Sequence, residues 1–175
     1  YSVSEKLFRL VSSVDNNTLM SIHHQENADE NIFFKDGSGS IADRRKAFNP
    51  DLAPFPGTGK RPFESIAGFL KPEQRLLLVH NTVTEQRDID FVEQYFRHVF
   101  WCFCPNANLF IEKKLPDINL FRAKNCKLTL GTDSLASNHQ LSIFEEIKTI
   151  QQYFPDIPLT ELLRWGTQHG AEVLG

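Results

Sequence analysis

The sequence predicts an α/β fold in which a parallel β-sheet is covered by helices. Leu76–Val79 reads LLLV, an apolar run without alternation that is typical of a strand buried on both faces. Strand and helix patterns alternate four times along the chain, as in consecutive βα units. Three apolar runs also end in a switch to polar residues, and the carboxyl ends of parallel strands are where such folds keep their functional groups.

The first half of the chain contains two predicted strands and the longest loop. Ser4 is a typical N-cap and Glu5 suits the first turn of a helix over Ser4–Val14, with Leu7 and Leu10 on one face. The longest loop is the segment Lys35–Arg61, and a loop of this length is typical of a lid, a binding loop or a disordered segment. The further elements expected here are a strand at Leu19–His23, a short helix at Ala28–Phe34, the Gly- and Pro-bearing excursion Lys35–Arg61 with a helical piece at Ile41–Phe48, a helix at Phe63–Leu70 and a strand at Leu76–His80.

The second half continues the alternation. Phe91, Tyr95 and Val99 recur at helical spacing and predict a helix over Asp88–Val99, and Pro155 ends a later helix. The further elements expected here are a strand at Trp101–Cys104, a helix at Leu115–Lys124, a strand at Leu128–Gly131, a helix at His139–Tyr153 and one or two helices within Leu159–Leu174.

The segment Leu128–Asn138, LTLGTDSLASN, places Asp133 at the end of a predicted strand. A carboxylate in this position can bind a divalent metal or accept a proton. The alternative is that Gly-Thr-Asp-Ser builds only a strand-to-helix turn, with Asp133 accepting backbone N–H groups. Asp133 is therefore a candidate site residue whose role depends on what the neighbouring strand ends carry.

Histidines follow two other predicted strands. One apolar run stops at His23 and His24, and another stops at His80. A single histidine at a strand end is usually a structural residue, but three strand ends that offer His, His and Asp favour a shared site. Because adjacent strand residues point to opposite faces, His23 and His24 cannot both face one metal, and His24 is interpreted as a packed residue or as one that contacts a ligand, rather than as a ligand itself.

Composition narrows the class of protein. Hydrophobic residues make up 41% and charged residues 23% of the 175 residues, close to the average for a folded domain. The net charge of -3 and the lack of a basic, aromatic-rich stripe argue against nucleic-acid binding, and no apolar run is long enough to cross a membrane. Three cysteines, Cys102, Cys104 and Cys126, suit a reduced, cytoplasmic protein; Cys102 and Cys104 share a strand face but are too far apart for an easy disulfide.

Four motifs resemble the later strands of the amidohydrolase superfamily. They are IHHQE at Ile22–Glu26, LLLVHNT at Leu76–Thr82, CPNANL at Cys104–Leu109 and GTDSLASN at Gly131–Asn138, of which the last is the most specific. The closest branch holds cytosine, guanine and S-adenosylhomocysteine deaminases, aminodeoxyfutalosine deaminase and the triazine chlorohydrolases. The closing TQHGAEVLG resembles the family's final barrel helix, which usually has Asn where this chain has His169.

The resemblance implies a partial TIM (β/α)8 barrel. Residues 1–175 would be the C-terminal half of the barrel, approximately strands five to eight with their helices, and a fragment of a longer chain. The opening YSVS resembles the family's stretch just after the fourth strand. The family's His-x-His on the first strand and its flanking β-sandwich have no counterpart in this sequence. We therefore expect the chain either to associate with the missing half or to form a homo-oligomer through its open strand edges.

The resemblance also implies roles for four residues. His23 and Asp133 would bind a divalent metal, most simply zinc with iron as the alternative, and Asp133 would also accept a proton. His80 would hydrogen-bond the attacking hydroxide or the developing tetrahedral centre, and Glu26 would transfer protons to the ring nitrogen and the leaving group. Asn106 and Asn138 are interpreted as loop-shaping residues rather than substrate contacts.

The expected function is a metal-dependent hydrolase that deaminates a small, amino-substituted heterocycle. Two alternatives remain at this point. The same site could hydrolyse a different C–N bond or a C–Cl bond, or the chain could be a catalytically inactive fragment or assembly module. Neither nucleic acid nor membrane is an expected partner.

Overall fold

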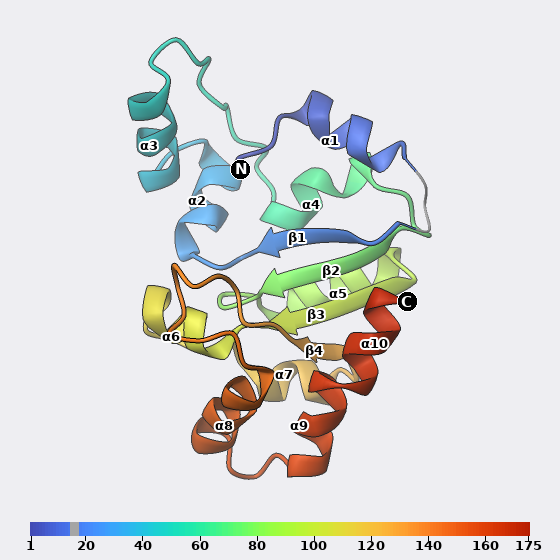
Figure 1. The fold of residues 1–175 in the computed structure, drawn as a ribbon. Helices are drawn as coiled ribbons and strands as arrows, with labels where there is room; N and C mark the ends of the chain where they lie inside the picture. Colours follow the sequence, from blue (N-terminus) through green and yellow to red (C-terminus); the bar gives the residue numbers. More distant parts are fainter. Residues whose placement is uncertain (15–17) are drawn as a thin grey trace.

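The computed structural model describes residues 1–14 and 18–175, and its centre is a four-stranded parallel sheet in the order β1-β2-β3-β4 (Figure 1). The prediction of an α/β fold with a parallel sheet is confirmed. All arrows in Figure 1 point the same way, so the carboxyl ends of the strands meet at one edge. The strands are β1 (Met20–His24), β2 (Arg75–His80), β3 (His98–Phe103) and β4 (Leu128–Leu130).

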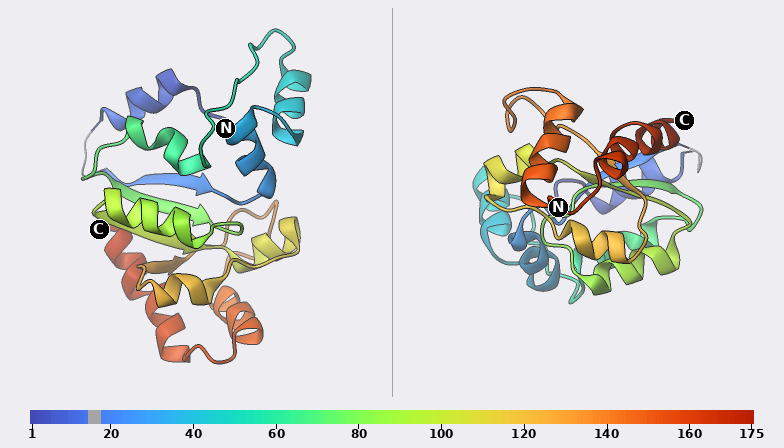
Figure 2. Two further views of the ribbon diagram at one scale, coloured as in Figure 1. Left: turned by 180° about the vertical axis from the view of Figure 1, so that it is seen from behind. Right: turned by 90° about the horizontal axis from the view of Figure 1, so that it is seen from below.

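Helices connect and flank the strands. Those preceding β2 gather beyond β1, those following β4 gather at the opposite side, and α5 and α7 lie across one face of the sheet (Figures 1 and 2). The helices are α1 (Glu5–Ser12), α2 (Ala28–Asp36), α3 (Ser40–Phe48), α4 (Pro62–Ile66), the 3-10 helix η1 (Ala67–Phe69), α5 (Gln86–Tyr95), α6 (Pro105–Glu112), α7 (Ile118–Ala123), α8 (Ile143–Tyr153), α9 (Leu159–Gly166) and α10 (Gln168–Leu174).

The main hydrophobic core lies between the sheet and the helices that cover it. It contains alternate residues of each strand, such as Leu76, Leu78 and Trp101, together with Ile89 of α5 and Phe121 of α7. All five side chains are fully buried. This burial of apolar surface is the main force that fixes the order and spacing of the strands.

The opposite face of the sheet is covered far less. Leu77 and Val79 are only partly buried there, next to a small cluster of Cys102, Cys104 and Ala107. His23 projects from β1 among exposed residues. One face of the sheet is therefore closed by helices, and the other, which carries His23, is open.

The predicted helix Asp88–Val99 was too long at its C-terminal end. The helix ends at Tyr95, because the backbone of Phe96 is extended (φ -120°, ψ 136°). Val99 belongs to β3, where it alternates with Trp101 and Phe103 on the helix-covered face. Phe91, Tyr95 and Val99 are spaced by four residues, as in a helix, but Val99 lies beyond the helix, in a strand whose side chains alternate with a period of two.

Two other element boundaries also differ from the prediction. Strand β3 ends at Phe103, and the next residues form α6, a helix that the sequence analysis did not predict. Its N-terminus is the CPNANL motif, and Pro105 occupies the first helical turn, where a missing N–H costs nothing. The helix expected from His139 begins only at Ile143, with Ser142 as its N-cap.

The excursion Lys35–Arg61 is an ordered arm rather than a structureless loop. Its two ends are joined by hydrogen bonds from Thr58 N–H to Phe34 O (2.7 Å) and from Gly59 N–H to Lys35 O (3.0 Å). Gly37 and Gly57 face each other at this neck with φ of 69° and 77°, and a Cβ on Gly37 would lie 2.1 Å from Phe55 O. The close approach of the two backbones therefore requires glycine.

Strands β1 and β4 are the two edges of the sheet, as expected for part of a barrel. Within the described residues each pairs with one neighbour only, β1 with β2 and β4 with β3. Apart from residues 15–17, on which the structure is silent, no helix combines the length and apolar character needed to cross a membrane.

Candidate metal centre

His80 reaches the open face of the sheet because of an unusual backbone conformation. Leu76 and Leu78 pack into the main core, and strict alternation would place His80 on the same face. However, His80 has a left-handed backbone (φ 79°), and its ring lies against that of His23, with centroids 5.1 Å apart. A non-glycine residue in this region costs about 1–3 kcal/mol, so the surrounding contacts must stabilise it.

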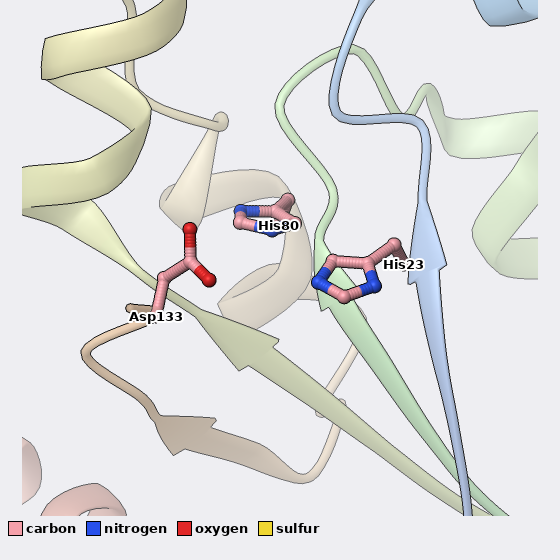
Figure 3. A group of neighbouring side chains, drawn as sticks. All are labelled: His23, His80 and Asp133. Carbon is pink, nitrogen blue, oxygen red and sulfur yellow. The ribbon is translucent and has the colours of Figure 1, made fainter. Parts of the chain in front are cut away.

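His23, His80 and Asp133 form the candidate metal centre. One potential ligand atom from each residue lies within 4.8 Å of the others. They come from β1, from the end of β2 and from the loop after β4, and Figure 3 shows the three side chains gathered at this edge. Three of the four residues selected from the sequence therefore meet at the carboxyl ends of the strands.

Glu26 lies beside this group. Its Oε1 is 3.7 Å from His80 Nε2, which is longer than a hydrogen bond. The side chain is 17% exposed. All four selected residues therefore lie in one region, although their roles remain predictions.

The loop that carries Glu26 is held by Glu30 on α2. The Glu30 carboxylate accepts hydrogen bonds from the backbone N–H groups of Gln25 (2.9 Å), Glu26 (2.9 Å) and Asn27 (3.3 Å). Burial raises the pKa of Glu30, and these three hydrogen bonds partly oppose that effect. The contacts fix the chain as it leaves β1, including Gln25 with its positive φ of 44°.

Asp133 is fixed by its own loop. Its backbone is left-handed (φ 56°), and the Ser137 hydroxyl donates a hydrogen bond to its Oδ2. Asn138 also holds this loop, because its Nδ2 donates hydrogen bonds to Thr132 O (2.8 Å) and to Glu146 Oε1 (2.7 Å). Asp133 thus has a hydrogen-bond donor on one oxygen and is not simply the cap of a backbone turn.

Asn106 and Asn138 shape loops, in agreement with the sequence interpretation. Both donate hydrogen bonds to the buried carboxylate of Glu146, Asn106 through its backbone and its side chain (2.9 Å each). Burial raises the pKa of Glu146, and the hydrogen bonds from the two asparagines oppose this shift. The arrangement ties the N-terminus of α6 to the loop that carries Asp133.

His24 lies on the opposite face of β1 from His23, as expected. It is 2% exposed and packs edge-on against Phe63 and Trp101. Burial lowers its pKa to about 4, and a hydrogen bond with Asn81 partly offsets this effect. His24 is therefore a neutral core residue and does not face the candidate metal centre.

The cysteines are free. Cys102 and Cys104 are buried on the open face of the sheet, and both sulfurs lie within 3.2 Å of the point where a Cβ would sit on Gly131. A hydrogen bond with Cys102, together with burial, raises the pKa of Cys104. Both are thus buried, unbridged thiols, which fits the expectation that they do not form a disulfide.

Sequence reasoning missed Asn108 and Glu30. Asn108 Oδ1 lies 3.0 Å from His80 Nδ1, and Glu30 holds the Glu26 loop. The CPNANL motif did single out the start of α6, but no sequence period shows that a helical Asn will contact a histidine on the preceding strand. Asn27 and Glu30 do form a recognisable capping pair, and this signal could have identified Glu30.

The sequence profile of the amidohydrolase family matches residues 7–175. The chain belongs to the amidohydrolase family. This confirms the resemblance that the four motifs indicated, and the candidate metal centre is therefore a site within a known family of hydrolases.

Curated relatives of this amidohydrolase chain are deaminases. An aminodeoxyfutalosine deaminase of Nitratiruptor sp. is 27% identical over 164 residues, which cover 90% of this chain and 38% of the relative. A 5-methylthioadenosine/S-adenosylhomocysteine deaminase of Bacillus cytotoxicus is 26% identical over 170 residues, which cover 93% of this chain and 34% of the relative. The chain thus spans little more than a third of these relatives.

Solved structures show the same fold. Helicobacter pylori aminofutalosine deaminase superposes with a TM-score of 0.79 at 22% identity, over 96% of this chain and 42% of that chain. An adenosine deaminase of Xanthomonas campestris with bound zinc superposes with a TM-score of 0.73 at 22% identity, over 99% of this chain and 36% of that chain. The amidohydrolase chain is therefore part of a TIM barrel, as predicted.

Proposed function

We propose that the complete protein is a metal-dependent deaminase that removes an amino group from a purine-like or pyrimidine-like heterocycle by hydrolysis. The observation that carries this proposal is the convergence of His23, His80 and Asp133 at the carboxyl edge of the sheet, with Glu26 next to them. Membership of the amidohydrolase family and deaminase relatives support the same chemistry.

The donor set fits a divalent metal. The imidazole of His23 and the carboxylate of Asp133 are ligand types that zinc and iron both accept, and beside them the buried Nε2 of His80 has no hydrogen-bond partner within the described residues. We propose His23 and Asp133 as ligands and zinc as the metal, with iron as the alternative; the zinc reported for the Xanthomonas neighbour supports this choice. A bound divalent ion would act as a Lewis acid and lower the pKa of water at the site.

The chain's own residues would share the proton transfers. Asp133, which accepts a hydrogen bond from Ser137 through Oδ2, would take a proton from the attacking water. Glu26 would transfer the other water proton to the ring nitrogen and would then carry the proton held by Asp133 to the departing amine, so that the two protons of the water end on the ring nitrogen and in ammonia. His80 would orient the attacking water beside Glu26, whose Oε1 is 3.7 Å from its Nε2.

The substrate class follows from the relatives. Their names specify aminodeoxyfutalosine, 5-methylthioadenosine and S-adenosylhomocysteine, which are all aminopurine nucleosides. We propose an aminopurine nucleoside as substrate and ammonia as the released product. We further propose that the chain is the C-terminal half of a barrel in a longer cytoplasmic protein and that it pairs with the other half or with a second copy.

Release of ammonia by the complete protein is the direct test. It should be measured with adenosine, 5′-methylthioadenosine, guanine and cytosine, on metal-free protein and after addition of zinc or ferrous iron. We expect turnover of at least one aminopurine nucleoside that depends on added metal. Ammonia release from none of the four compounds by fully metal-loaded protein would overturn the proposal.

A further inference from the structure

Asn108 makes contacts that fix the orientation of its side-chain amide. It lies on α6, is fully buried, and its Nδ2 is 2.6 Å from Thr82 Oγ1 and 3.4 Å from the carbonyl oxygen of His80. A carbonyl oxygen only accepts hydrogen bonds, so the NH₂ group must face His80 O. The amide oxygen of Asn108 must then be the atom that lies 3.0 Å from His80 Nδ1.

This orientation decides which nitrogen of His80 carries hydrogen. An amide oxygen cannot donate, so the hydrogen of the contact must be on Nδ1 of the ring. In a neutral imidazole the other nitrogen, Nε2, is then unprotonated and offers a lone pair. Nε2 is buried, has no hydrogen-bond partner within residues 1–14 and 18–175, and lies 3.7 Å from Glu26 Oε1.

A second histidine-asparagine pair in the same sheet follows the same rule. Asn81 Nδ2 donates to Leu78 O (2.8 Å) and Cys102 O (3.2 Å), so its Oδ1 faces His24 Nδ1 at 3.0 Å. His24 Nε2 is likewise buried and has no hydrogen-bond partner in the part of the chain that the structure describes, but it lies on the core face, away from His23 and Asp133. The His24–Asn81 pair is therefore an internal control for the His80–Asn108 pair.

We propose that Asn108 is a positioning residue that locks His80 in the Nδ1–H tautomer and thereby turns an Nε2 lone pair toward the candidate metal centre. The catalytic meaning of this inference rests on the proposed deaminase function. In this tautomer the neutral ring accepts a hydrogen bond from the attacking water through Nε2 and does not donate one to the tetrahedral centre. The resemblance left two roles open for His80, a hydrogen bond with the attacking hydroxide or one with the tetrahedral centre, and the tautomer selects the first.

Nitrogen NMR of the complete protein, labelled with ¹⁵N in its histidine rings and freed of metal, tests the tautomer directly. The His80 signals are identified by their loss in His80→Gln. We expect a protonated Nδ1 and an unprotonated Nε2 in the wild type and in Asn108→Asp, because a carboxylate also only accepts at this contact. In Asn108→Leu we expect protonated Nε2 to appear, while the His24 signals stay unchanged.

Turnover by the metal-loaded variants provides a second readout. Loss of an outer hydrogen-bond partner of this kind typically costs ~10–100-fold, so we expect such a fall in kcat for Asn108→Leu and a smaller one for Asn108→Asp. The inference is overturned if wild-type His80 carries its hydrogen on Nε2, or if Asn108→Leu leaves the tautomer unchanged. If Asn108→Leu does not fold, the wild-type spectrum alone decides. If the NMR spectrum shows the predicted tautomer but the metal-loaded protein releases no ammonia, the deaminase proposal is wrong and the inference about Asn108 still holds.

Discussion

The imidazole rings of His23 and His80 stack with centroids 5.1 Å apart and planes inclined by 22°. His23 reaches this position as an ordinary residue of β1, whereas His80 requires a left-handed backbone. The rings adjoin, yet the proposed mechanism gives them different tasks, metal binding for His23 and orientation of water for His80. Substitutions that separate these tasks are the most informative experiments on this site.

Substitution of either proposed ligand should remove the metal. In the complete protein, we expect His23→Ala and Asp133→Ala to lower metal affinity by more than the ~10–100-fold typical of outer-shell substitutions, and to abolish turnover. Elemental analysis after dialysis measures this effect. The exposed His98 at the other end of β3 is the matched control, and His98→Ala should retain metal and activity. Full metal content in both ligand variants would show that the ligands are elsewhere.

Substitution of the proton-transfer residues should separate catalysis from metal binding. Glu26→Gln and His80→Asn should lower kcat by ~10²–10⁴-fold, the usual contribution of general acid-base groups, with near-normal metal content. Steady-state kinetics beside elemental analysis gives both quantities. If metal is lost in His80→Asn while turnover per metal ion is unchanged, His80 is a ligand and the proposed division of roles is wrong.

The ion pair between Arg61 and Asp88 should make stability depend on pH. Burial alone would raise the pKa of Asp88, but hydrogen bonds from Arg61 and Glu85 N–H bring it below its ordinary value of 3.8. A carboxyl group whose pKa is lower in the folded state contributes its full stability above the unfolded pKa. This contribution is lost as the pH falls through the folded pKa.

Arg61→Met therefore should lower the free energy of unfolding at neutral pH by about 3–5 kcal/mol, because it leaves the Asp88 carboxylate buried without its cation. The difference from the wild type should shrink as the pH falls below 3.8, the ordinary value, and through the lower pKa of folded Asp88, where its carboxylate becomes protonated. Urea denaturation across this range measures both. Arg87→Met is the control, since Arg87 pairs with Glu85 at the surface, and such pairs contribute about 0–1 kcal/mol. Equal effects of the two substitutions would contradict the assignment.

The neck of the Lys35–Arg61 arm offers a matched pair of glycine substitutions. Gly37 and Gly59 have nearly the same φ (69° and 70°), but a Cβ on Gly37 would lie 2.1 Å from Phe55 O, whereas one on Gly59 would meet nothing within 4 Å. Gly59→Ala should therefore cost only the left-handed strain of about 1–2 kcal/mol. Gly37→Ala should cost more and should expose the arm to limited proteolysis. Equal stability of the two variants would mean that the neck is not closed.

The open edges of the sheet should drive association of the isolated chain. Strands β1 and β4 have unpaired edges within the described residues, and the face that carries His23 is open. Light scattering on purified residues 1–175 should therefore report a species larger than 20.1 kDa. A stable monomer of that mass with tight zinc binding would overturn the assignment as half of a barrel.

Periodicity and strand-end chemistry were enough to predict the parallel sheet and a shared site for His23, His80 and Asp133, whereas Glu26 was selected only through the resemblance to the amidohydrolase superfamily. They were not enough to show how His80 reaches the site. Strict alternation assigns its side chain to the core face, and the left-handed backbone of His80 (φ 79°) directs the ring to the open face instead. A left-handed histidine is stabilised by distant contacts, here with Asn108 on α6, and carries no local signature. The same limit explains why Asn108 was missed.

The boundary at Val99 illustrates a different limit. Its spacing from Phe91 and Tyr95 fits a helix, and its spacing from Trp101 and Phe103 fits a strand, so the sequence alone supports both. Val99 belongs to the strand because β3 pairs with β2, and in this pairing Val99 lies opposite Leu76. Tertiary contacts that span more than twenty residues determine this choice, and local patterns do not contain them.

The closed neck at Gly37 and Gly57 has a consequence for how this protein can evolve. The backbone hydrogen bonds at Phe34 and Lys35 hold the base of the arm, and Ser40 and Arg45 of α3 tie its middle part to Asp29 and to the backbone of Tyr1. Around Phe48, which is 90% exposed, the arm can therefore gain or lose residues more readily than at its base or at these contacts. This outer part of the arm is a natural site for grafting new recognition elements near the candidate metal centre.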